Sequence, residues 1–155
     1  MGLFSKLKNS LTGGWAEVKV MIPEGGVERG ASLPVTIEVQ VKDETIDVSK
    51  IYLKFCCEEV VDIPNFRSRD EDNRNDIDYV HVNVKSDLLD EEFVIEEGLT
   101  LESNQTYTYD GNLSVPEDLP PSFTGRHATV EWSVYAGLDM RGNDPDSGWV
   151  EVEVY

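Results

Sequence analysis

The sequence predicts an all-β fold, an antiparallel β-sandwich of about eight strands, and three observations support this prediction. Apolar and polar residues alternate with a period of two along most of the chain, as in strands that are buried on one face. Turn-forming segments such as PEGGVERGAS and RGNDPDSG separate these runs. The chain has 155 residues, the length of one domain. Short strands at this spacing are typical of a two-sheet sandwich with immunoglobulin-like architecture.

Each expected strand has valine, isoleucine, leucine or another apolar residue at every second position. The expected strands cover residues 18–22, 35–41, 51–61, 77–84, 92–96, 107–115, 128–140 and 150–154. In the sixth strand the apolar positions fit one face only if a bulge interrupts the ladder near Gly111. The two prolines of LPPSF cannot donate to a ladder, so they predict an extended crossover before the longest strand.

Helical periodicity occurs only in residues 1–12, which are expected to form a short amphipathic helix or arm. This segment misses the myristoylation pattern because position 6 is lysine. Two interpretations stay open: the helix packs across the edge of the sandwich, or it touches a partner or a membrane surface peripherally. Under the second interpretation, the residues that bind the partner are Leu3, Phe4 and Leu7.

The composition is strongly acidic, since 31 Asp and Glu against 13 Lys and Arg give a formal net charge of −18. A field of this sign repels phosphate backbones, which argues against nucleic acid as a partner of the domain as a whole. Two interpretations of the acidic excess stay open. It serves solubility alone, or it adapts the protein to the salty cytoplasm of a halophile, where a short Debye length screens self-repulsion.

The sequence predicts a cytoplasmic protein. It has no run of 18 or more apolar residues, and the apolar stretch of MGLFSKLKNSL is too short for a secretory signal. Cys56 and Cys57 are neighbours in an expected strand and therefore point to opposite faces. They are poorly placed to form a disulfide with each other, and a reducing cytosol suits them.

The sequence contains no arrangement typical of an enzyme. The only two histidines, His81 and His127, lie on expected outward faces, and no G-x-S-x-G pattern accompanies them. Two histidines and two adjacent cysteines lack the spacing of a zinc site. The glycine pairs of the chain lack the lysine and helix of a phosphate-binding loop. We therefore expect neither catalysis nor a cofactor.

One acidic segment, RDEDNRNDID, resembles a calcium loop only superficially. Counted from Asp70, the fifth position is Arg74 and the sixth is Asn75, where an EF-hand loop needs an oxygen ligand and a glycine. We therefore expect a solvated loop between two strands. The candidates for a cation site in this loop are Asp70, Asp72 and Asp76.

The positions of the tryptophans in their strands indicate which aromatic side chain is available to bind a ligand. Trp132 shares the core-facing register of its strand, whereas Trp149 falls on the opposite register from Val150. Trp149 is therefore the aromatic residue to test as a stacking face for a carbohydrate or another ligand.

The chain resembles the arrestin-like fold in the segment from Gly14 to Phe55, GWAEVKVMIPEGGVERGASLPVTIEVQVKDETIDVSKIYLKF, and again in LPPSFTGRHATVEWSVYAGLDM. Within that fold it is most similar to the bacterial and archaeal sporulation-control family related to the sporulation stage 0 protein M. The shared features are the amphipathic MGLFSKLKNSL opening, the GGVERGASLPVTIEVQV and IDVSKIYLKF segments, and the Leu-Pro-Pro-Ser-Phe loop.

The resemblance implies that residues 1–155 form one arrestin-like domain, normally the first of two. It also implies a non-catalytic scaffold or adaptor with protein partners, in sporulation or cell-stage control. Phosphate-sensing residues do not carry over, because Arg29, Arg126 and Arg141 match by neighbourhood and not by motif. A carbohydrate- or ligand-binding sandwich module is the alternative, and the partners and the oligomeric state stay open.

Overall fold

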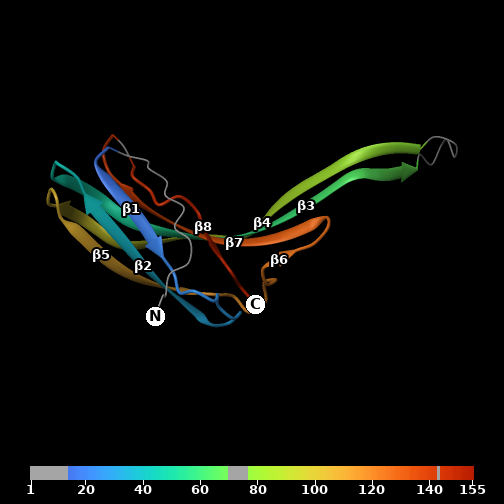
Figure 1. Cartoon of the computed structure of the whole chain (residues 1–155), viewed down its shortest axis with the longest axis horizontal. Coiled ribbons are helices and arrows are strands. Elements are labelled where there is room, and N and C mark those ends of the chain that lie inside the picture. Colours follow the sequence, from blue (N-terminus) through green and yellow to red (C-terminus); the bar gives the residue numbers. More distant parts are fainter. Residues whose placement is uncertain (1–13, 70–76, 143) are drawn as a thin grey trace.

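The protein is an antiparallel β-sandwich of two sheets in the computed structural model, which describes residues 14–69, 77–142 and 144–155. The strands are β1 (Ala16–Met21), β2 (Ser32–Val41), β3 (Ile46–Arg69), β4 (Ile77–Leu101), β5 (Thr106–Ser114), β6 (Phe123–Thr124), β7 (Ala128–Asp139) and β8 (Val150–Val152). One sheet has the order β1-β2-β5 (Figure 1). The other has the order β4-β3-β7-β6, with β8 also paired to β7. The predicted fold class is confirmed.

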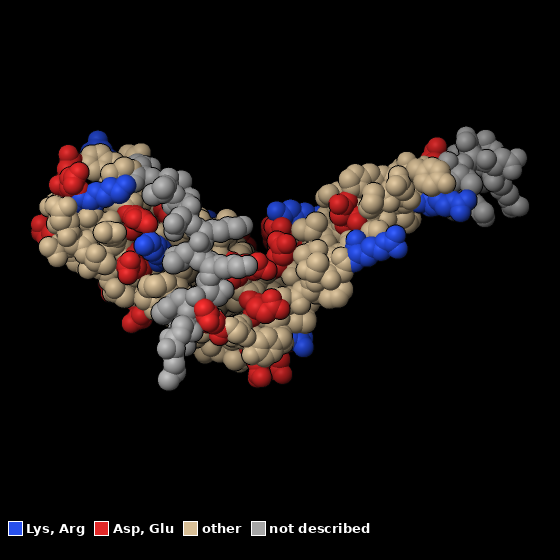
Figure 2. All heavy atoms as spheres, in the orientation of Figure 1, with Lys and Arg blue, Asp and Glu red and all other residues tan. Residues whose placement is uncertain are grey.

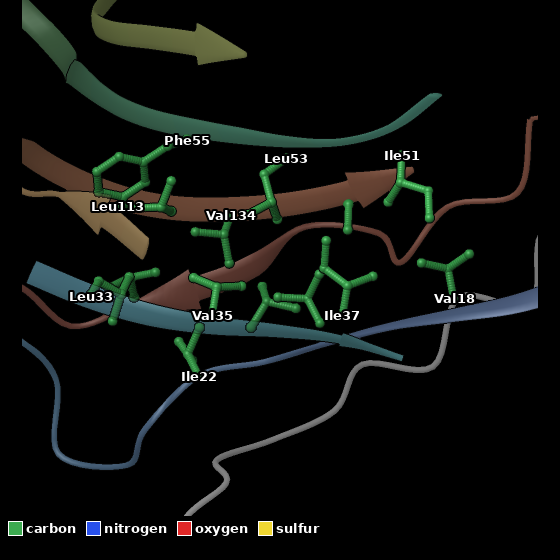
Figure 3. Packing of buried hydrophobic residues seen from close by; sticks show 14 of the residues in the cluster. Val18, Ile22, Leu33, Val35, Ile37, Ile51, Leu53, Phe55, Leu113 and Val134 are labelled. Carbon is green, nitrogen blue, oxygen red and sulfur yellow. The ribbon is translucent and has the colours of Figure 1, made fainter. Parts of the chain in front are cut away.

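The core lies between the two sheets and follows the predicted alternation. Along β2, the side chains of Leu33, Val35, Ile37, Val39 and Val41 are buried while the residues between them are not. On the other sheet, the core-facing positions of β3 and β7 carry the two largest buried side chains, Phe55 and Trp132 respectively. Their ring centroids are 5.3 Å apart. Figure 3 shows side chains from both sheets meeting in this interior. Burial of this apolar surface is the main driving force for the fold.

The largest difference from the sequence prediction concerns β3 and β4. Their 24 and 25 residues exceed the usual strand length of about 3–10 residues. The structure extends β3 past Val61 to Arg69, and it joins the two expected strands at 77–84 and 92–96 into the single strand β4. The β3–β4 register shifts at three places, and two of the shifts move the apolar positions to the other parity, one near Leu88 in β4 and one between Ile63 and Phe66 in β3. In the sequence, such a change of parity resembles the end of one strand and the start of another.

The bulge that was predicted near Gly111 is wrong. The β2–β5 register runs without a shift from Ser32 opposite Ser114 to Gln40 opposite Thr106. Gly111 is explained by packing instead, because a Cβ atom there would lie 2.8 Å from Cδ1 of Leu53 on the other sheet. Glycine therefore allows the two sheets to approach closely at this position.

The double-proline loop is a crossover, as predicted, and it closes over the end of the core. The indole Nε1 of buried Trp132 donates to the carbonyl oxygen of Pro120 at 3.0 Å. The hydroxyl of Ser122 donates to the Val152 carbonyl at 3.3 Å and accepts from the Val154 amide at 2.9 Å. After the prolines, the short strand β6 pairs with β7.

Beyond the sandwich, β3 and β4 continue together as a two-stranded arm, defined here as residues 60–69 and 77–86 (Figure 1). No helix long and apolar enough to cross a membrane occurs among the residues that the structure describes. The expected helix with Leu3, Phe4 and Leu7 lies outside these residues. So do the candidate cation ligands, which are Asp70, Asp72 and Asp76.

Candidate functional site

The outer face of the five-stranded sheet contains a groove of about 710 Å³, which we name the arm-base groove. Strands β3, β4, β7 and β8 all contribute to its lining, and Trp149, just before β8, lies on one side. The groove reaches the base of the arm, where Lys85 of β4 lines it. Figure 2 shows acidic side chains gathered where the arm leaves the sandwich. The surface is therefore both concave and charged.

Acidic side chains predominate in the arm-base groove. Two lysines, Lys54 and Lys85, line it together with five carboxylates, those of Glu58, Asp87, Asp90, Glu131 and Glu151. Five negative and two positive side chains leave a formal charge of −3. Lys85 Nζ lies 2.6 Å from a carboxylate oxygen of Glu58, and this hydrogen bond raises the lysine pKa. Positively charged groups are therefore attracted to this surface.

The register of the sheet explains why these side chains share one surface. In β3 and β7 the core-facing positions alternate with outward positions, and Glu58 lies opposite Glu131 on the outer face. Ser133 lies opposite Cys56 and also opposite Glu151 of β8. Polar residues from three neighbouring strands are therefore brought into one patch.

A row of aromatic rings borders the groove. Tyr135 lies between Tyr52 and Trp149, with ring centroids 6.3 Å from the first and 5.1 Å from the second. Lys50 Nζ is 5.2 Å from the centroid of the Tyr52 ring. At the end of the row, the Tyr52 ring covers Gly137, where a Cβ atom would contact the phenol. The side chain of Trp149 is 48% exposed, so its ring remains accessible to a ligand.

The tyrosines of the row remain uncharged at physiological pH. Burial is the first cause that raises the pKa of Tyr135, and a hydrogen bond with Asp146 adds to it. Burial likewise raises the pKa of Tyr52. The row therefore offers neutral ring faces beside a carboxylate-lined surface, an arrangement that suits cationic groups.

The thiol of Cys56 lines the groove, and its environment makes it unreactive. Burial raises its pKa to about 11, with a further contribution from its 3.5 Å hydrogen bond to Asp90. Burial also raises the pKa of Cys57 to about 11. Both cysteines are free, as expected for adjacent residues that face opposite sides of a strand. Because the thiolate is the nucleophile, neither is prepared for nucleophilic chemistry.

We expect slow alkylation of Cys56 by iodoacetamide. At pH 8, raising the pKa from 9.0 to about 11 lowers the thiolate fraction about 100-fold. The rate measured by mass spectrometry should therefore be about 100-fold below that of a cysteine peptide, and it should still rise at pH 10. A Cys56→Ser variant, which retains the buried Cys57, identifies the reacting thiol. A rate that levels off near pH 9 would contradict the raised pKa.

The structure brings the two histidines to the same residue, a proximity that the sequence did not predict. Nε2 of His81 is hydrogen-bonded to the Asp62 carboxylate, and Nδ1 of His127 lies 3.2 Å from the Asp62 carbonyl oxygen. Both lie at the base of the arm, where Asp62 also donates its amide to the His127 carbonyl at 2.8 Å. These contacts hold the arm against β7.

Sequence reasoning identified Trp149 but missed the carboxylates around it. The structure places Trp149 in the groove, whereas it places Leu3, Phe4 and Leu7 outside the described residues. The outward register of Glu58, Glu131 and Glu151 could be read from the alternation in each strand. The sequence did not reveal that these strands are neighbours, because β3 and β7 pair through residues that are far apart along the chain.

Comparisons with known proteins support the fold. No family model matches the sequence, and no curated protein matches it. A solved structure, the sporulation control protein Spo0M from Bacillus subtilis, matches 91% of this chain with a TM-score of 0.62 and 18% sequence identity. The match covers 49% of the Spo0M chain, so this chain spans about half its length. At this identity the comparison shows the fold alone, and it supports the arrestin-like, Spo0M-like sandwich that the sequence predicted.

Proposed function

We propose that the protein is a non-catalytic scaffold or adaptor that recognises a protein partner through the arm-base groove. The observation that supports this most is the position of the half-exposed Trp149 ring beside a concave surface lined by five carboxylates. The fold shared with Spo0M supports a role in the control of sporulation or of another cell stage. The partner carries lysine or arginine side chains, which the aromatic ring and the carboxylates both attract.

The chemistry of the groove is consistent with binding. Both histidines bond to Asp62, while the Cys56 thiol bonds to Asp90 and has a raised pKa. General base catalysis of nucleophilic attack needs a base within hydrogen-bond reach of its nucleophile. The groove instead presents five carboxylates and the ring of Trp149, and the sheet holds them in fixed positions. Binding of a partner requires side chains that are fixed in this way.

Photo-crosslinking tests this proposal. A photoreactive amino acid at Ser133, on the groove surface, should crosslink a partner in extracts of the native host. The same amino acid at Glu38, on the other sheet, should not crosslink that partner. Trp149→Ala in the Ser133-labelled protein should remove most of the product. Equal crosslinking from both positions, or a product indifferent to Trp149→Ala, would contradict recognition through the groove.

A carbohydrate-binding function is the second candidate, and the row of Tyr52, Tyr135 and Trp149 supports it. Sugar rings stack on aromatic faces, and neighbouring carboxylates accept hydrogen bonds from hydroxyl groups. Binding on a glycan array, together with quenching or a shift of tryptophan fluorescence that Trp149→Ala abolishes, would favour this function. An array without binding and an unchanged fluorescence spectrum would remove it.

A further inference from the structure

Four outward side chains of the arm-base groove form one row that crosses the strands. Asp90 of β4 lies opposite Cys56 of β3, which lies opposite Ser133 of β7. Ser133 in turn lies opposite Glu151 of β8. Residues directly opposite each other in antiparallel strands share a face, so their side chains lie side by side. All four line the groove, and we name them the crossing row.

The crossing row is negatively charged at both ends and neutral in the middle. Asp90 and Glu151 are exposed carboxylates. Between them, Ser133 carries no charge, and the Cys56 thiol stays protonated because burial raises its pKa to about 11. These two small side chains form a floor between the carboxylates. Neighbouring strands are about 4.8 Å apart, so three spacings place the ends of the row about 14 Å apart.

The charges around the crossing row favour a basic segment that lies across the strands and not along them. Lys54 lies on one side of the row in β3, and on the other side Lys85 of β4 pairs with Glu58. A basic segment parallel to the strands would therefore meet a lysine in each direction. Across the strands it meets carboxylates. A second acidic row runs the same way, since Glu58 lies opposite both Asp87 and Glu131.

We propose that the partner binds through an extended segment that crosses the strands and carries two basic residues four positions apart, with an uncharged residue midway. This inference rests on the proposed function of the groove. Alternate residues of an extended segment share a face, and four residues span about 13 Å, close to the length of the crossing row. The two basic side chains then reach Asp90 and Glu151, while the residue midway faces the neutral floor.

Trp149 makes the Glu151 end of the crossing row the stronger one. Trp149 lies two residues before Glu151 and shares its outward parity, and its ring is half-exposed. A guanidinium group can stack on this ring while it donates hydrogen bonds to the Glu151 carboxylate. At the other end, the Asp90 carboxylate already accepts a hydrogen bond from the Cys56 thiol at 3.5 Å. We therefore expect arginine at the Glu151 end.

Two peptides of equal composition test the spacing, with binding to the whole chain followed by NMR titration. In SRTATRS the arginines are four positions apart, whereas in SRARTTS they are two apart. Only the first peptide reaches both carboxylates, so it should bind about two- to fivefold more tightly, the factor that one partly exposed ion pair provides. The amide signals of Ser133 and Glu151 should shift during the titration, because both residues line the groove.

Variants at the two ends make the test specific to the crossing row. Asp90→Asn or Glu151→Gln should make the affinities for the two peptides equal, and Glu151→Gln should weaken SRTATRS more. Glu38→Gln, on the other sheet, is the matched control and should keep the preference. Asp90 and Glu151 are exposed, so neither substitution should change the unfolding transition, which circular dichroism checks.

Three results would overturn the crossing segment. They are no binding of either peptide, equal affinities of the wild type for both, and a preference for SRTATRS that both end variants keep. The proposed function is tested separately, because crosslinking of the native partner from Ser133 does not depend on these peptides. A crosslinked partner together with equal peptide affinities would therefore contradict the spacing alone.

Discussion

Replacing Trp132 by alanine is expected to lower the free energy of unfolding by about 3–5 kcal/mol, measured by urea titration. Trp132 is fully buried, and its ring packs against Phe55 in the centre of the sandwich. The substitution leaves a cavity between the sheets. It also removes the indole donor from the Pro120 carbonyl, so the double-proline loop loses its link to the core.

Two further variants separate these contributions. Trp132→Phe retains most of the packing and loses the hydrogen bond, so we expect a smaller loss of about 1–3 kcal/mol. Trp149→Ala is the matched control, because that ring is 48% exposed and its loss should cost less than about 1 kcal/mol. An alanine variant at position 132 that is no less stable than the Trp149 variant would contradict the packing described here.

Gly26→Ala is expected to destabilise the protein by about 2–4 kcal/mol. Gly26 has a φ of 76°, which an L-residue adopts only at a cost. A Cβ atom there would also contact the Glu153 carbonyl oxygen and lie 3.2 Å from its carbonyl carbon. The neighbouring Val27 amide donates to the same oxygen at 2.8 Å, and Val27 forms a parallel bridge with Val154. The substitution therefore forces the C-terminal segment at Glu153 and Val154 away from this turn.

Gly25→Ala provides the control for backbone strain. Gly25 has a φ of 90°, and a Cβ atom there would have no neighbour within 4 Å. We expect a cost of about 1–2 kcal/mol from strain alone. The difference between the two alanine variants then measures the contact with Glu153. Equal losses in the two urea titrations would show that this contact contributes nothing.

Local patterns were sufficient to predict the sandwich itself. The alternation in β2 and β7 identified the buried positions because each of these strands faces the core along its whole length. The same rule failed in β4, where a register shift near Leu88 places an extra residue in the strand. A bulge changes the parity of the apolar positions, so one long strand resembled two short ones.

The arm and the groove depend on pairings between distant segments. The arm forms only when Val61 is paired with Val84 and Phe66 with Val80. The groove appears only when β3 lies beside β7 and β7 beside β8. A single sequence reports which residues share a face of one strand, but not which strands are neighbours. For that reason Trp149 could be identified alone while its carboxylate surroundings could not.

The affinity of the crosslinked partner for groove variants tests the central proposal most directly. In a calorimetric titration, the variant with Trp149→Ala and Glu131→Lys should bind the purified partner at least about tenfold more weakly than the wild type. Both residues line the groove, and the lysine adds a positive charge where a basic partner is expected. Glu38→Lys, on the other sheet, makes the same charge change as a control. Recognition through the groove predicts that Glu38→Lys binds like the wild type, whereas equal affinities for the groove variant and the wild type would contradict it.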